Sequence, residues 1–182
     1  LLLVETGSLM DPPGKAGLAE LSLTLLAKGA IRGSGGAEHA ADAGDIAHAA
    51  DGLGGSIEIG SGAQASRIAM TVAANRLDDC LALLSDLLRR PTLAADELER
   101  SRAQELDAIK LSLSDPGLLA EQLGRRLFWG DTPAGLLATP ASLARIRRED
   151  VQAFHRQQIR PDRVTLILAG DVDLAQARTL AD

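Results

Sequence analysis

Aromatic residues are scarce in this chain of 182 residues. It has no tyrosine, and its aromatic side chains are Phe128, Trp129 and Phe154, about 2% of the sequence. Stacking of nucleic-acid bases and recognition of quaternary ammonium groups both need aromatic platforms. We therefore expect neither kind of site, and we expect leucine and alanine to fill an aliphatic core.

Cysteine and an excess of positive charge are also missing. Cys80 is the single cysteine, which excludes an intrachain disulfide framework and a four-cysteine metal site. The chain carries 19 Lys and Arg against 25 Asp and Glu, a formal net charge of −6. Because affinity for phosphate backbones depends on clustered positive charge, we expect no nucleic-acid partner. Cys80 lies among leucines at helical spacing, which favours a packed thiol over a nucleophile.

Long apolar runs are absent as well. No run approaches the roughly 18 to 20 residues that cross a bilayer, so we expect no membrane span. With 46% hydrophobic and 24% charged residues, the composition is that of an ordinary globular domain. No shift in composition marks an internal boundary, so residues 1–182 are predicted to form a single domain. The chain opens on Leu1-Leu2-Leu3-Val4 without a basic leader, and we expect it to be an excerpt of a longer polypeptide.

The periodicity of apolar residues predicts an α+β fold. Spacings of three and four predict helices at about 17–28, 38–51, 94–113 and 148–158, and from Leu77 to the stop at Pro91. Further helices are expected to start at Asp115-Pro116, Thr139-Pro140 and Asp173. Alternation predicts strands within 1–8 and 164–168 and a hairpin over 57–72. This order suits helices packed on a mostly antiparallel sheet.

Glycine and histidine give no local cofactor motif. The segment Gly52-Leu53-Gly54-Gly55 follows a predicted helix and precedes a strand, the reverse of a dinucleotide-binding fingerprint. Gly33-Ser34-Gly35-Gly36 predicts a flexible loop. His39 and His48 are nine residues apart and so do not share a helical face, and His155 is distant. We expect the three histidines to be solvated surface residues.

Short segments spread over nearly the whole chain follow one another in a recognisable order. The first half contains Val4-Glu5-Thr6-Gly7-Ser8, Gly17-Leu18-Ala19, Lys28-Gly29-Ala30, Gly54-Gly55 and Arg89-Arg90-Pro91. The second half contains Asp96-Glu97-Leu98, Ser114-Asp115-Pro116, Gly135 before Ser142-Leu143, Asp150-Val151 with Phe154, Arg160-Pro161-Asp162 and Ala169-Gly170-Asp171-Val172. Together they resemble the pitrilysin-type M16 metallopeptidase family. The match is to the first domain of a family half-molecule, entered after its first strand.

The resemblance also shows where this chain departs from active family members. In those members the helix after Gly-Leu-Ala carries H-x-x-E-H, in which two histidines bind zinc and the glutamate polarises water. Here Glu20 and Thr24 stand at the histidine positions and Leu23 at the glutamate position. Thr24 is a poor zinc ligand and Leu23 cannot accept a proton, so no catalytic residue is implied. The family's His-Pro-Tyr-Gly segment is likewise altered, to Thr132-Pro133-Ala134-Gly135.

The family's third zinc ligand is a glutamate on the long helix that corresponds to 94–113. Glu105 is the only carboxylate on the face of Leu98 and Ile109, which makes it the candidate. Two interpretations stay open. Glu20 and Glu105 are either remnants of a site, or Glu20 favours a first helical turn while Glu105 borders the core.

The resemblance implies a closed chamber built from homologous αβ domains in two halves, of which often only one carries zinc. Our main hypothesis is a non-catalytic domain that encloses or binds peptide and pairs with a zinc-bearing catalytic half or subunit. The alternatives are an active zinc metallopeptidase with ligands rebuilt from Glu20, Glu105 and a histidine, and a purely structural assembly domain.

The expected cofactors, partners and compartment follow from the main hypothesis. It expects no cofactor in this chain, zinc residing in the partner. We also expect a dimer or a multidomain assembly, and export to the periplasm as in many bacterial relatives. Extended peptides commonly add to sheet edges, so the hairpin over residues 56–72 is where peptide contact would be sought.

Overall fold

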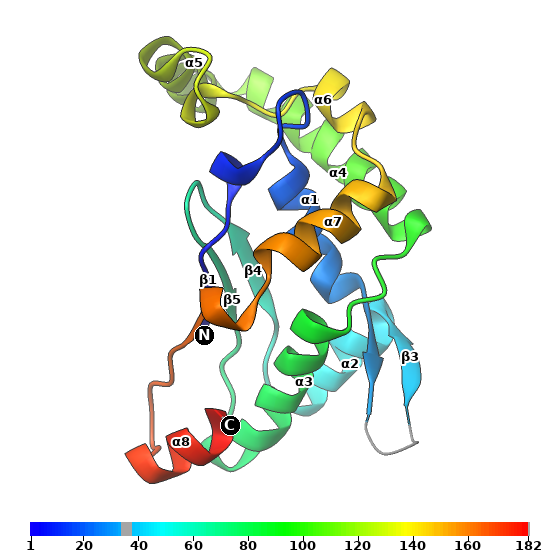
Figure 1. Ribbon diagram of the computed structural model, residues 1–182, viewed down its shortest axis with the longest axis vertical. Coiled ribbons are helices and arrows are strands. Elements are labelled where there is room, and N and C mark those ends of the chain that lie inside the picture. Colours follow the sequence, from blue (N-terminus) through cyan, green and yellow to red (C-terminus); the bar gives the residue numbers. More distant parts are fainter. Residues whose placement is uncertain (34–37, 182) are drawn as a thin grey trace.

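The computed structural model of this protein describes residues 1–33 and 38–181 (Figure 1). The strands are β1 (Leu2–Val4), β2 (Gly29–Arg32), β3 (His39–Asp42), β4 (Glu58–Ser61), β5 (Ser66–Ala69) and β6 (Val164–Leu166). The helices are α1 (Leu18–Thr24), α2 (Ala43–Gly52), α3 (Leu77–Arg89), α4 (Ala95–Ser114), α5 (Pro116–Trp129), α6 (Pro140–Ala144), α7 (Arg148–Gln158) and α8 (Leu174–Ala181). Among the described residues, no helix has the length and apolar character that a bilayer crossing requires. The loop expected at Gly33-Ser34-Gly35-Gly36 lies, from residue 34 onward, outside the described residues.

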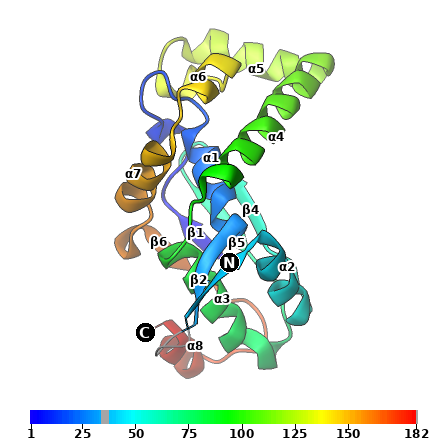
Figure 2. The same ribbon diagram turned by 90° about the vertical axis from the view of Figure 1, so that its right-hand side faces the viewer.

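Four strands form an antiparallel sheet in the order β4-β5-β1-β6, and β2 pairs with β3 in a separate hairpin. In the sheet Leu2 lies opposite both Ile68 and Leu166, which fixes the register of the three strands around β1. Figure 2 shows α5 across one end of the molecule, with α4 descending from it beside α1 toward β2. The predicted α+β class, helices on a mostly antiparallel sheet, is confirmed.

Helix α1 contributes leucines to two separate hydrophobic clusters. Leu23 packs with residues of the sheet and of α3, among them Val4, Ile68 and Leu84. Leu21 packs with residues of α4, α6 and α7 in the other cluster. In Figure 1, α1 accordingly runs through the middle of the molecule, between β4 and α7. Apolar side chains on both flanks therefore hold this helix in place.

The predicted helix over 38–51 is wrong in its first part. Residues His39–Asp42 form β3, and the helix begins only at Ala43. The boundary is set by a capping box, in which the Asp42 carboxylate accepts from the Asp45 N–H at 3.0 Å and the Asp45 carboxylate accepts from the Asp42 N–H at 3.1 Å. The alanine-rich sequence has no periodicity that distinguishes a strand from a helix. Residues 39–42 form a strand because they pair with β2.

Gly29 begins β2 directly after the helical segment predicted over 17–28. The helical turn ahead of it continues to Lys28 as a 3₁₀ helix over Leu25–Lys28. A Cβ at Gly29 would lie 2.3 Å from Oγ1 of Thr92, so glycine allows this close approach.

Other boundaries differ by a few residues or agree. Gly60 and Ser61, expected in the hairpin turn, belong to β4, and the strand expected over 164–168 ends at Leu166. The predicted helix starts are confirmed, since Asp115 caps α5 and Thr139 caps α6. Cys80 is buried on the apolar face of α3, where burial raises the pKa of its thiol.

Candidate functional site

The start of α1 is held by a buried carboxylate. Asp11 accepts a hydrogen bond from the Gly17 N–H at 2.7 Å and another from the Ala19 N–H at 2.7 Å. Gly17 has a φ of +99°, a conformation that glycine adopts without strain. Burial raises the pKa of Asp11, although the backbone hydrogen bonds oppose this. These contacts fix the first turn of α1 and therefore the position of Glu20.

A cavity of about 440 Å³ lies at the N-terminal end of α1. Its walls come from distant parts of the sequence: Glu20 from α1, Ser61 from β4, Glu105 from α4 and Arg125 from α5. The remaining lining residues are Ser8, Asp11, Ala16, Gly17, Gly62, Ala63, Leu136 and Ala138. The structure thus brings the two glutamates singled out in the sequence to one cavity.

The cavity is electrostatically unfavourable for two ionised carboxylates. Burial is the main factor that raises the pKa of Glu20, and repulsion from Glu105 and Asp11 adds to it. A hydrogen bond with the Ser61 side chain acts in the opposite direction. Burial also raises the pKa of Glu105. Both groups therefore hold a proton more tightly than an exposed glutamate does.

The other two motif positions do not join this cavity. Leu23 is 0% exposed and belongs to the core between the sheet and α3. Thr24 is half-buried, and neither residue lines the cavity. Leu23, which the family resemblance aligns with the glutamate that polarises water, is therefore a core residue.

No histidine reaches the two glutamates. His39 and His48 are exposed, as expected. His155 is half-buried rather than solvated, because its Nε2 lies 2.8 Å from the carbonyl oxygen of Leu88. None of these three histidines is among the residues that line the Glu20 cavity.

The donor set does not fit a zinc ion. Across residues 1–33 and 38–181, no group of three or more His, Cys, Asp or Glu side chains is placed to hold a metal. The Asp11 carboxylate is already engaged by two backbone N–H groups, which leaves Glu20 and Glu105 as the other carboxylates at the cavity. Zinc sites in proteins use three or four protein ligands, so two carboxylates do not make one.

Three residues of the cavity were not singled out in the sequence: Asp11, Ser61 and Arg125. Asp11 had a local signal, because a carboxylate in a turn just ahead of a helix is a typical partner for free N–H groups. Arg125 donates to the Leu136 carbonyl at 3.1 Å and lines the cavity without an ion pair to either glutamate within the described chain. Ser61 and Arg125 reach the cavity through the tertiary fold, so no local pattern reveals them.

Comparison with known protein families identifies the family of this chain. The profile described as "Insulinase (Peptidase family M16)" matches residues 1–136, and the one described as "Peptidase M16 inactive domain" matches residues 145–182. The chain belongs to the M16 peptidase family, as its sequence motifs predicted. The two matched segments share one fold, because β6 pairs with β1 and α7 packs on α1.

Individual proteins and solved structures are similar to this chain in sequence or in fold. An uncharacterised zinc protease of Mycobacterium tuberculosis (strain H37Rv) is 30% identical over 132 residues, 71% of this chain and 30% of that protein. The crystal structure of a peptidase M16 inactive domain from Pseudomonas fluorescens has a TM-score of 0.85 and 25% identity, over 99% of this chain and 42% of that one. The periplasmic protease PqqL from Escherichia coli has a TM-score of 0.79 at 17% identity, over 98% of this chain and 20% of that one. The chain thus spans less than half the length of these relatives.

Proposed function

We propose that this M16 peptidase-like domain is non-catalytic, that it binds peptide, and that it acts with a zinc-bearing partner half. The observation that carries the proposal is the combination of a core leucine, Leu23, at the position of the catalytic glutamate with an open cavity that holds Glu20 and Glu105. A site without a base cannot activate water by proton transfer. The cavity still offers polar groups to a bound chain.

Strand β4 supports peptide binding beside this cavity. Among the described residues β4 pairs with β5 alone, so its other side is an edge of the sheet. Ser61 ends this strand and also lines the cavity, together with Gly62 and Ala63 of the following turn. An extended peptide that adds to β4 would therefore run along the cavity with Glu20 and Glu105.

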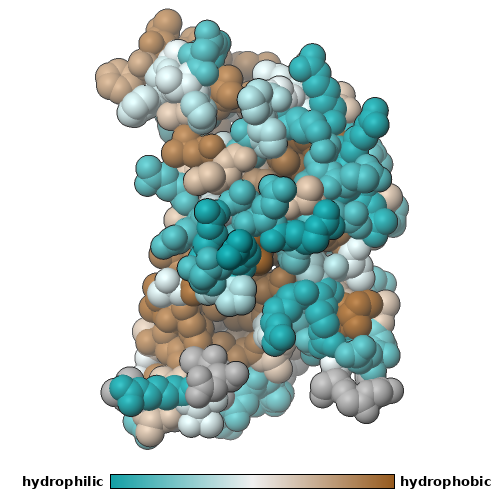
Figure 3. Space-filling view, viewed as in Figure 1, coloured by the Kyte–Doolittle hydropathy of each residue, from teal (hydrophilic) through white to brown (hydrophobic). Residues whose placement is uncertain are grey.

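The exposed apolar end of α5 supports a partner. No residue of α5 is buried, and Leu127, Phe128 and Trp129 are 84%, 78% and 49% exposed. Figure 3 shows this hydrophobic surface at the upper end of the molecule. A run of large exposed apolar side chains is typical of a protein contact. Because Trp129 is the only tryptophan of the sequence, its emission reports on such a contact, and we expect a blue shift when a partner half is added.

The first experiment measures metal and activity together. The purified chain is dialysed against trace zinc, its metal content is measured by plasma mass spectrometry, and peptide cleavage is assayed with and without a zinc-bearing M16 half. We expect no stoichiometric zinc and no cleavage by the chain alone. One zinc per chain together with cleavage would support the active-peptidase alternative, in which case Glu20→Ala should abolish the activity.

The second experiment tests the peptide site. The turn after β4 offers a matched pair of variants, because exposed Ala63 lines the cavity while its exposed neighbour Gln64 does not. We expect Ala63→Trp to weaken peptide binding about tenfold or more, and Gln64→Trp to leave it unchanged. Photo-crosslinking of bound peptide to residues 56–72 is the second measurement. Equal affinities of the two variants, without labelling of the hairpin, would favour the purely structural alternative.

We propose the periplasm as the compartment. The support is the similarity in fold to the periplasmic protease of Escherichia coli. Fractionation of the full-length protein, expressed with a C-terminal tag, tests this. Recovery in the cytoplasmic fraction would contradict it.

A further inference from the structure

A second cavity adjoins the Glu20 cavity. Its volume is about 380 Å³, and it lies between α5, α6 and the loop that leads into α1 (Figure 1). Ala16 and Leu136 line both cavities, so the two spaces meet at these residues. Arg126 of α5 and Arg145, directly after α6, line the second space, which we call the arginine cavity.

The arginine cavity has the opposite charge to its neighbour. Among the described residues that line it there are two arginines and neither aspartate nor glutamate. Arg126 donates to the Gly130 carbonyl at 2.6 Å and pairs with Asp131, whose side chain is 92% exposed. Because such an exposed ion pair contributes little energy, it leaves Arg126 able to attract a second anion. The cavity is therefore positive, although the whole chain carries a net charge of −6.

Arg145 is the cation of this cavity that has no partner. It is exposed, and within residues 1–33 and 38–181 its guanidinium forms neither an ion pair nor a hydrogen bond. The guanidinium lies against the loop ahead of α1, since a Cβ at Gly14 would be 3.2 Å from its Nη1 atom. Thr139 adds a hydroxyl group, and leucines 136 and 137 add apolar walls. The lining thus offers hydrogen-bond donors to an anion and apolar surface to the group that carries it.

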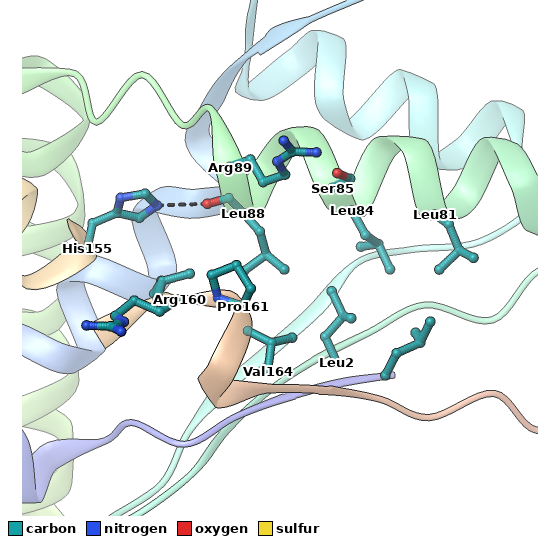
Figure 4. Close-up of a pocket in the computed structure, with 12 residues that line it drawn as sticks. Leu2, Leu81, Leu84, Ser85, Leu88, Arg89, His155, Arg160, Pro161 and Val164 are labelled. Atoms are coloured by element: carbon teal, nitrogen blue, oxygen red, sulfur yellow. Dashed lines mark hydrogen bonds between the residues drawn. The ribbon is translucent and has the colours of Figure 1, made fainter. Parts of the chain in front are cut away.

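The backbone that carries Arg145 is held in place. Arg102 of α4 donates to the carbonyl oxygens of Leu143 at 2.6 Å and of Ile146 at 2.8 Å, one on each side of Arg145. Helix α7, which follows, is joined to α3 by His155, whose ring Figure 4 shows directed at a carbonyl oxygen of that helix. A cation on a fixed backbone loses less entropy when it binds an anion.

We propose that the arginine cavity binds a carboxylate of the same peptide that lies beside Glu20. This inference rests on the proposed function and adds the class of peptide, which has an acidic side chain or a free C-terminus at the position that reaches Arg145. The carboxylate accepts hydrogen bonds from the guanidinium of Arg145, which offers two parallel donors. The negative Glu20 cavity repels the same carboxylate, so the two cavities together set the direction in which the peptide lies.

Peptides derived from one parent test the proposed chemistry. The parent is a mixed sequence of alanine, serine and leucine, blocked at both ends and therefore uncharged. One series places a single glutamate at each position in turn, and another series is shortened stepwise and ends in a free carboxylate. Isothermal titration calorimetry with the 182-residue chain measures each affinity.

We expect the parent to bind, and a carboxylate at one position to tighten binding about tenfold or more, because hydrogen bonds to charged groups are the stronger ones. The series that shows this gain identifies the source of the carboxylate. If the parent binds and no carboxylate improves its affinity, the inference is overturned while the peptide site beside Glu20 stands. Binding by none of the peptides overturns both.

A charge reversal tests the role of Arg145. The carboxylate peptide should bind the Arg145→Glu variant no more tightly than the parent peptide does, and Arg145→Gln, which removes the charge alone, should also lose the gain. Arg156→Glu is the matched control, because Arg156 is exposed on α7 and does not line either cavity, and this variant should keep the gain. Thermal unfolding verifies that all three variants are folded. A gain that survives in both Arg145 variants overturns the inference.

The Ala63→Trp variant shows whether one peptide occupies both cavities. Ala63 lines the Glu20 cavity and not the arginine cavity. We expect this substitution to weaken the carboxylate peptide by the same factor as the uncharged parent, about tenfold or more. A carboxylate peptide that binds the variant as tightly as the original chain would occupy the arginine cavity alone, which contradicts the inference.

Discussion

Glu20 of α1 and Glu105 of α4 face one cavity, where burial raises the pKa of Glu20 and the charge of Glu105 raises it further. Neither carboxylate forms an ion pair within the described part of the chain, although Arg125 lines the same cavity. Burial therefore opposes the ionisation of both carboxylates, and repulsion from Glu105 adds to this at Glu20. This relationship makes the cavity a source of pH-dependent instability rather than a source of stability.

Removing one of these charges should stabilise the fold at neutral pH. The folded-state pKa of Glu20 lies above its unfolded value, so the stability of the original chain falls as pH rises from the unfolded pKa through the folded pKa. Glu20→Gln does not titrate, and its advantage should grow across that window and stay constant above it. Urea denaturation at a series of pH values measures the difference. An advantage of Glu20→Gln that stays the same across this pH range would contradict the prediction.

Replacing Glu105 should change the pKa of Glu20. Glu105→Gln removes a negative charge that raises the pKa of Glu20, so that pKa should fall. Carbon-detected NMR titration of the glutamate carboxyl groups measures it. An unchanged Glu20 pKa would show that the two groups are not coupled in solution.

Leu23 should behave as a core residue. Leu23→Ala removes a side chain that is 0% exposed and leaves a cavity, so we expect a loss of about 2 to 5 kcal/mol in the free energy of unfolding. The same substitution at Leu127, which is 84% exposed, should change it by about 0.5 kcal/mol or less. A small effect at Leu23 would mean that this face of α1 is not packed in solution.

Asp11 should be needed for the start of α1. Asp11→Ala leaves the N–H groups of Gly17 and Ala19 without their acceptor in a buried region, which should cost about 1 to 3 kcal/mol. Asp11→Asn keeps one side-chain oxygen and should lose less. Thermal unfolding of the two variants gives the comparison, and equal losses would contradict the role of the carboxylate as a two-fold acceptor.

The capping box of α2 should contribute measurably. Asp42→Ala removes the acceptor for the Asp45 N–H, and we expect a loss of about 1 kcal/mol. Asp51→Ala, an exposed substitution near the other end of the same helix, is the control and should have little effect. A loss at position 51 equal to that at position 42 would argue against the cap.

Short sequence motifs predicted where several helices begin. Asp115-Pro116 and Thr139-Pro140 each combine a side-chain acceptor with a proline at the first helical turn, so the starts of α5 and α6 are encoded within a few residues. The hairpin of β2 and β3 was missed because its second strand, His39–Asp42, is stabilised by pairing with residues 29–32 and not by its own period.

The cavity was only partly predictable for the same reason. Glu105 stood out because it shares a helical face with Leu98 and Ile109, and Glu20 because of its place in the motif. Ser61 and Arg125 join them through the sheet and through the turn from α4 to α5, respectively. No spacing in the sequence brings these four residues together, so only the tertiary structure shows that they line one space.

The placement of α1 between two hydrophobic clusters limits how the cavity can change shape. A shift of this helix would disrupt leucine contacts on both of its flanks at once, so the wall that carries Glu20 is fixed. A change in the shape of the cavity would therefore involve α5, which has no buried residue, and β4, which pairs on one side only among the described residues. Of the walls of the cavity, α1 is therefore the rigid one, and α5 and β4 are the ones that can move.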